Sequence, residues 1–116
     1  MTLIECRHHV ISAMFGNATA VATDTIIVQH SEAMAATVEG RIVLLSVRAG
    51  AYFELNRVGG EIWEMLSAPR RVGDICEILA QSHDADLAEV TRDVIDFVAV
   101  LIKRKLARVV GPDEMR

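Results

Sequence analysis

The chain has 116 residues, the size of a single domain, and 52% of them are hydrophobic. Its formal net charge is −4, and only 4% of its residues are aromatic. This composition argues against a nucleic-acid partner, because phosphate recognition needs a basic surface and base stacking needs aromatic rings. The longest apolar run, residues 97–102, falls far short of the roughly 20 residues that span a bilayer. We therefore also expect no membrane partner.

Residues 1–30 are predicted to be an N-terminal extension that carries one or two extra strands. Two segments, residues 4–15 and 19–28, are rich in β-branched side chains, and Gly16-Asn17 between them is typical of a turn. Residues 111–116 at the other end are typical of a frayed tail. The recognisable domain is therefore expected over residues 31–110.

The N-terminal segment does not have the pattern of a secretory signal. Glu5 stands where a signal is basic, and the short apolar stretch at residues 10–15 is interrupted by Ser12. We expect a cytoplasmic protein, in which Cys6 and Cys76 are free thiols.

A three-stranded antiparallel meander is predicted in the first half of the chain. Three strand-like segments, residues 33–38, 41–47 and 51–55, are joined by turns at Glu39-Gly40 and Arg48-Ala49-Gly50. Loops this short connect antiparallel neighbours.

Three helices are predicted to follow the meander. Asn56 is a suitable N-cap for the first, which ends before Pro69. Apolar residues at helical spacing predict a second helix over residues 72–82. Asp86, with Glu89 three residues later, is a variant of the capping box at the start of the third.

A short strand over residues 106–110 is expected to end the fold. The element order predicts an α+β domain of winged helix-turn-helix-like type, with a three-stranded antiparallel sheet followed by three helices.

No residue pattern indicates catalysis or a metal site. Cys6, His8 and His9 are metal-ligand types, but adjacent side chains on a strand point to opposite faces. Cys76 lies on the apolar stripe of the second helix, which favours a buried structural thiol. We therefore expect neither enzymatic activity nor a cofactor. Trp63 is expected in the core.

The third predicted helix is acidic in its first half. This half contains one basic residue, Arg92, and four acidic residues: Asp86, Glu89, Asp93 and Asp96. A winged-helix regulator would place this helix against DNA, where four acids repel phosphate. A DNA-binding regulator is therefore the weaker alternative.

One stretch of the sequence is more specific. Residues 55–66 read L-N-x-x-G-x-x-I-W-x-x-L, and residues 93–98 read D-V-I-D-F-V. These strings resemble the PqqD-like family, which includes the recognition elements for precursors of ribosomally made natural products, among them the stand-alone lasso-peptide type. Arg71 departs from the family pattern, since a Thr-like N-cap usually opens the second helix there.

The resemblance implies a module that binds the leader segment of a precursor peptide and hands it to a maturation enzyme, such as a leader peptidase or a radical S-adenosylmethionine enzyme. The leader would add as a strand to residues 51–55 and lie against the third helix. The expected peptide-binding residues are Ala51, Tyr52, Phe53, Glu54, Leu55, Glu89, Val90, Asp93, Val94 and Phe97. Val90, Val94 and Phe97 would line an apolar pocket, although the same spacing also fits three core residues.

The strand over residues 51–55 comes last in the meander, so one of its edges is expected to be open. An open edge suits strand addition. The N-terminal extension is an alternative occupant of that edge, in its own chain or in a partner's, and a homodimer is a further alternative.

Overall fold

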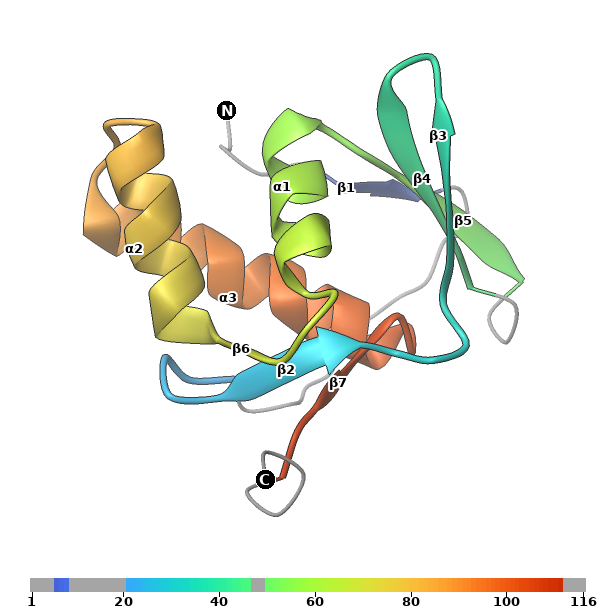
Figure 1. The fold of residues 1–116 in the computed structure, drawn as a ribbon. Helices are drawn as coiled ribbons and strands as arrows, with labels where there is room; N and C mark the ends of the chain where they lie inside the picture. The colour runs from blue at the N-terminus through green and yellow to red at the C-terminus, as the bar shows by residue number, and fades with distance from the viewer. Residues whose placement is uncertain (1–5, 9–20, 47–49, 112–116) are drawn as a thin grey trace.

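A computed structural model describes residues 6–8, 21–46 and 50–111 of the chain. Its helices and strands form two antiparallel sheets and three helices (Figure 1). The first sheet has the order β1-β5-β4-β3, with bounds Cys6–His8, Ala51–Leu55, Arg41–Ser46 and Met34–Val38. The second has the order β6-β2-β7, with bounds Arg70–Arg71, Ile26–Gln29 and Ala107–Val109. The helices are α1 Arg57–Met65, α2 Val72–Ser82 and α3 Leu87–Lys103.

The predicted meander is present as strands β3, β4 and β5. The turn between β3 and β4 is built on Glu39 and Gly40, with φ of 53° and 81°. Both angles lie in the left-handed region, which glycine tolerates without steric cost. The second predicted turn falls on residues 47–49, outside the described residues.

Two of the three helix starts carry the predicted side-chain caps. The Asn56 Oδ1 atom accepts a hydrogen bond from the Gly59 amide at 2.8 Å. A carboxylate oxygen of Asp86 accepts one from the Glu89 amide at 3.1 Å. Both caps satisfy amides that the first helical turn leaves without an intrahelical acceptor.

Helix α2 starts differently, because the Arg71 side chain makes no capping hydrogen bond. Instead, the Val72 amide donates to the Thr25 carbonyl at 2.9 Å, and the Gly73 amide donates to the Thr23 carbonyl at 2.8 Å. The backbone just before β2 therefore replaces the missing side-chain cap. This explains how the chain tolerates arginine at position 71.

The second sheet joins the N-terminal part of the chain to its C-terminal part. Strand β2 pairs with both β7 and β6, and Ile27 in its middle is fully buried. β2 thus packs into the hydrophobic core although it lies before residue 31, where the recognition domain is predicted to begin.

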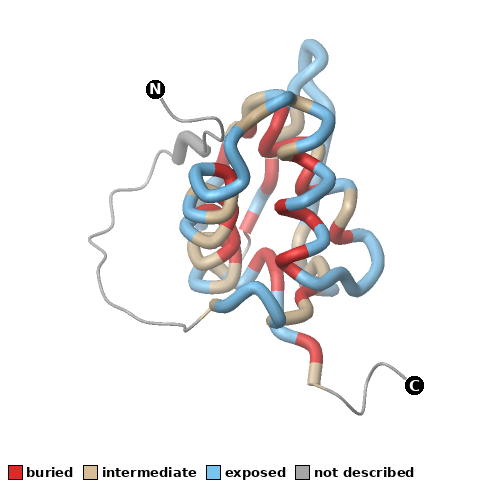
Figure 2. The backbone as a smooth tube through the Cα atoms, turned by 90° about the vertical axis from the view of Figure 1, so that its left-hand side faces the viewer, coloured by how far each residue is buried: buried red, intermediate tan, exposed pale blue. Residues whose placement is uncertain are grey.

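The core lies between the helices and the inner faces of the two sheets. Figure 2 shows the buried residues on the sides of the helices that face the interior. The fully buried side chains of largest volume include Phe53, Leu55, Ile62, Leu79 and Leu101. Trp63 is 5% exposed and Cys76 is 1% exposed, so both predicted core residues are confirmed as buried.

The α+β class, the antiparallel pairing and the three helices agree with the sequence-based prediction, and the winged-helix assignment remains a prediction. The predicted turn at Gly16-Asn17 lies outside the described residues. β1 and β2 do not pair with each other but belong to different sheets. Strand pairing between distant segments is set by tertiary packing, which local propensity does not encode.

Candidate functional site

Strand β5 divides its predicted binding residues between two faces of the sheet. Phe53 and Leu55 point inward and are each 1% exposed, whereas Tyr52 is 45% exposed on the outer face. Glu54 shares the outer face with Tyr52, because side chains two apart on a strand lie on the same side. The side chains of β5 therefore do not form one continuous surface for a peptide, and the element that a peptide could follow along the strand is its backbone.

Glu54 already has a partner on the neighbouring strand. The Arg41 Nη1 atom donates to the Glu54 Oε2 atom at 3.3 Å; the Arg41 side chain is exposed and the Glu54 side chain is partly exposed. Such an exposed ion pair contributes little to stability, so Glu54 can exchange partners at small cost.

The predicted apolar residues of α3 lie in the hydrophobic core. Val90, Val94 and Phe97 are 1%, 0% and 5% exposed. Their side chains therefore lie in the core, which is the alternative that the helical spacing left open. Glu89 is exposed and Asp93 is half-buried, so these two acids remain accessible.

One flank of α3 brings three of the predicted residues together. Thr91 faces α2, where its side chain hydrogen-bonds with the Cys76 thiol. At about 100° of rotation per residue, Glu89, Asp93 and Phe97 lie on the opposite flank. The two acids of this flank are accessible and make it a candidate contact surface, whereas Phe97 is buried beneath it.

Val100 continues the same flank one turn further along and is half-buried. It is absent from the predicted set, although its spacing of seven residues from Asp93 places it there.

Cys76 has no feature of a reactive thiol. Burial raises the pKa of the Cys76 thiol, an effect that its hydrogen bond with Thr91 partly offsets. A neutral, buried thiol is a poor nucleophile and a poor metal ligand. Among the described residues there is no group of three or more His, Cys, Asp or Glu side chains that could hold a metal ion.

The outer edge of β5 is not open, which corrects the expectation from the sequence. β1 pairs with β5 in antiparallel fashion, so β5 lies between β1 and β4 (Figure 1). The register places Cys6 opposite Leu55, Arg7 opposite Glu54 and His8 opposite Phe53. The N-terminal extension, which the sequence left as an alternative occupant, holds this edge in its own chain.

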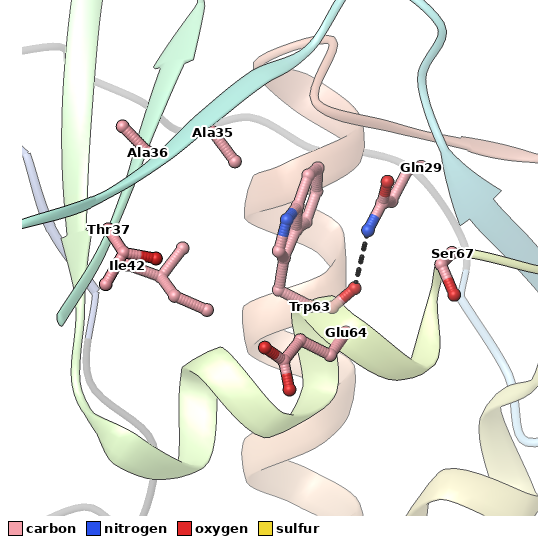
Figure 3. Close-up of a pocket in the computed structure, with 8 residues that line it drawn as sticks. All are labelled: Gln29, Ala35, Ala36, Thr37, Ile42, Trp63, Glu64 and Ser67. Atoms are coloured by element: carbon pink, nitrogen blue, oxygen red, sulfur yellow. Dashed lines mark hydrogen bonds between the residues drawn. The ribbon is translucent and has the colours of Figure 1, made fainter. Parts of the chain in front are cut away.

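A hollow of about 350 Å³ lies beside the opposite edge of the sheet, and the sequence did not indicate it. Figure 3 shows Trp63 in its centre, between Ala35 of β3 and Gln29 of β2. The Gln29 Nε2 atom donates to the Trp63 carbonyl at 2.8 Å, which ties β2 to the end of α1. The full lining is Gln29, Ala35, Ala36, Thr37, Ile42, Trp63, Glu64 and Ser67.

A second hollow of about 450 Å³ continues along α1 and shares Thr37, Ile42 and Glu64 with the first. Gly60 lines it, and a Cβ atom at this position would lie 3.2 Å from the Ile42 Cδ1 atom. At Gly60, therefore, α1 packs close to the Ile42 side chain of β4.

No helix within the described part of the chain has the length and hydropathy to cross a membrane.

These features define a small α+β domain whose sheet accepts an additional strand along β5. The chain belongs to the family of coenzyme PQQ synthesis protein D (PqqD), whose family model matches residues 41–107. The matched segment runs from the start of β4 to the start of β7 and includes all three helices. The family resemblance seen in the sequence is therefore confirmed.

A solved structure with a similar fold is TbiB1 in complex with the TbiA(beta) leader peptide. The two chains are 28% identical with a TM-score of 0.62, and the similarity covers 72% of this chain and 95% of that one. No curated protein matches the sequence. The comparisons give no support to the DNA-binding alternative.

Proposed function

We propose that this protein is a non-catalytic module that binds the leader segment of a ribosomally made precursor peptide and presents it to a maturation enzyme. The observation that carries the proposal is the similarity to a leader-bound protein over nearly all of that protein's length. The family assignment supports the same function class.

The proposed binding mode is strand addition to β5. An extended peptide gains affinity from main-chain hydrogen bonds and specificity from the side chains beside the new strand. β1 supports this mode, because it shows that β5 accepts an antiparallel neighbour on the side away from β4.

The specificity of the site is proposed to come from its acids. Glu54 lies on β5, and Glu89 and Asp93 lie on α3. Acidic side chains on both elements favour a leader with basic residues, since complementary charge speeds encounter and selects the partner. Tyr52 adds an aromatic surface on the outer face, and Val90, Val94 and Phe97 support α3 from within the core.

The maturation enzyme is proposed to be a leader peptidase or a radical S-adenosylmethionine enzyme, acting in the cytoplasm. A binding module of this kind raises the local concentration of the precursor at the enzyme without itself reacting.

The test is a titration of the full chain with the labelled leader segment of the precursor encoded beside its gene, followed by fluorescence anisotropy. We expect a dissociation constant below 100 µM, which corresponds to more than about 5 kcal/mol of binding free energy. A scrambled leader of the same composition and a duplex DNA are the controls. Absence of saturable leader binding at that concentration, or equal binding of the scrambled sequence, would contradict the proposal.

A further inference from the structure

The N-terminal strand and an incoming leader would use the same backbone groups. β1 spans three residues and pairs antiparallel with β5 at Leu55, Glu54 and Phe53. These are three of the five residues of β5, and β4 holds the other side of the strand. Because one strand edge pairs with one neighbour at a time, β1 and a leader on this edge exclude each other.

β1 is separate from the part of the chain that defines the family. The family model begins at Arg41, more than thirty residues after β1 ends. The first sheet has its family part in β4 and β5, and β1 enters it as an added edge strand. Removing β1 from β5 therefore leaves the pairing of β4 with β5 and with β3 in place.

We infer that β1 is a built-in competitor for the leader-binding edge, so that a leader binds by displacing it. The inference rests on the proposed function and adds a regulatory element to the same site. The chain between His8 and Ile26 tethers β1 to the domain, and a tether of this kind gives an effective concentration on the order of millimolar. Even a three-residue strand then occupies the edge often enough to weaken leader binding.

The competition has a built-in selectivity. A leader that pairs with more of β5 than three residues gains backbone hydrogen bonds that β1 does not make. A peptide that pairs with three residues or fewer makes no more backbone hydrogen bonds to β5 than β1 does, so it has no advantage over β1. β1 thus favours long, well-matched leaders over short extended segments of other proteins.

The first experiment breaks β1 by substitution within the full chain. Consecutive backbone N–H groups on a strand point to opposite edges, so one of Arg7 and His8 directs its N–H toward β5. The double variant Arg7→Pro/His8→Pro therefore removes a donor to β5 whichever residue supplies it. The matched control, Arg7→Ala/His8→Ala, makes the same changes in charge and keeps both N–H groups.

We expect the proline variant to bind the labelled leader three- to tenfold more tightly than the parent and the alanine variant to differ from it by less than twofold. Amide hydrogen exchange at residues 53–55 should be faster in the proline variant without leader. Equal affinity of parent and proline variant, with measurable binding in both, would overturn the inference and leave the proposed function standing. Absence of leader binding in every variant would overturn both.

The second experiment locks β1 in place and does not depend on how proline affects folding. Arg7 and Glu54 are directly opposite in the register, so Arg7→Cys/Glu54→Cys in a Cys6→Ser background permits a cross-strand disulfide. We expect the oxidised protein to bind leader at least tenfold more weakly than the same protein after reduction. Equal binding by the oxidised and reduced forms would show that β1 and the leader use different places.

Discussion

The two edges of the first sheet differ in what covers them and in what lies behind them. β5 is paired on both sides, and its inward side chains Phe53 and Leu55 are buried. β3 pairs only with β4 among the described strands, and all five of its residues are exposed (Figure 1).

Strand β3 itself carries neither of the two residue types that most often protect an edge strand, a charged residue or a proline. It reads Met-Ala-Ala-Thr-Val. Its outward residue Met34 continues a cross-strand row with Leu45 and Tyr52, and these three side chains are 53%, 40% and 45% exposed. The homodimer alternative remains a prediction.

The edge that the family resemblance assigns to the leader is thus the one that carries a strand, and the edge of β3 is the one without a partner among the described strands. β5 is paired with β1 on its outer side, whereas β3 borders two hollows. Variants that act on one edge and not on the other can therefore test the assignment.

The largest expected effect is on the free energy of unfolding, and it compares a core residue of α3 with a residue that lines the first hollow. Phe97→Ala should lower the free energy of unfolding by about 3–5 kcal/mol, because Phe97 is 5% exposed within the core. Ile42→Ala, at the half-buried wall of the hollow, should lower it by only about 1–2 kcal/mol. Urea denaturation followed by circular dichroism measures both. A loss below about 1 kcal/mol for Phe97→Ala would mean that the ring is free to line a peptide pocket, as the family resemblance implied.

The next effect is on leader affinity and compares two acid-to-lysine substitutions, one on α3 and one beside β3. Asp93→Lys, on the flank of α3, should weaken binding of a basic leader by about 1.4 kcal/mol, or tenfold. Glu64→Lys, at the hollow beside β3, should change it by less than twofold. Titration of both variants at low and at high salt checks this, and the difference should shrink as salt rises. The reverse ranking would move the leader to the β3 edge.

The sequence predicts those parts of this fold that depend on neighbouring residues. The strands β3 to β5, the turn at Glu39-Gly40 and the caps at Asn56 and Asp86 all follow from signals within a few residues. Each uses turn chemistry or capping that acts over one turn of chain.

The parts that the sequence did not predict depend on contacts between distant segments. The pairing of β2 with β7 joins residues about eighty positions apart, and β6 is a two-residue strand with no pattern of its own. Helical spacing identified Val90, Val94 and Phe97 as one apolar face but could not tell what that face packs against. The occupant of the β5 edge was one of several alternatives for the same reason, because edge pairing depends on where the extension lies in space.

The smallest expected effect compares two glycines. Gly73 lies at the start of α2 against the backbone before β2, and Gly60 lies in α1 beside the second hollow. A Cβ atom at Gly73 would lie 3.1 Å from the backbone oxygen of Thr23, which also accepts the Gly73 amide hydrogen bond. Backbone held by a hydrogen bond cannot move without losing it, so Gly73→Ala should destabilise the domain by about 1 kcal/mol.

At Gly60 the corresponding neighbour is the Ile42 Cδ1 atom at 3.2 Å, the end of a side chain that can rotate into the adjacent hollow. Gly60→Ala should therefore be neutral or stabilise the domain by up to about 0.5 kcal/mol, because alanine favours the helix. Thermal unfolding of the two variants side by side measures the difference. If Gly60→Ala were as destabilising as Gly73→Ala, the Ile42 side chain would be held as rigidly as the backbone that caps α2. The expected difference between a side-chain neighbour and a backbone neighbour would then be wrong.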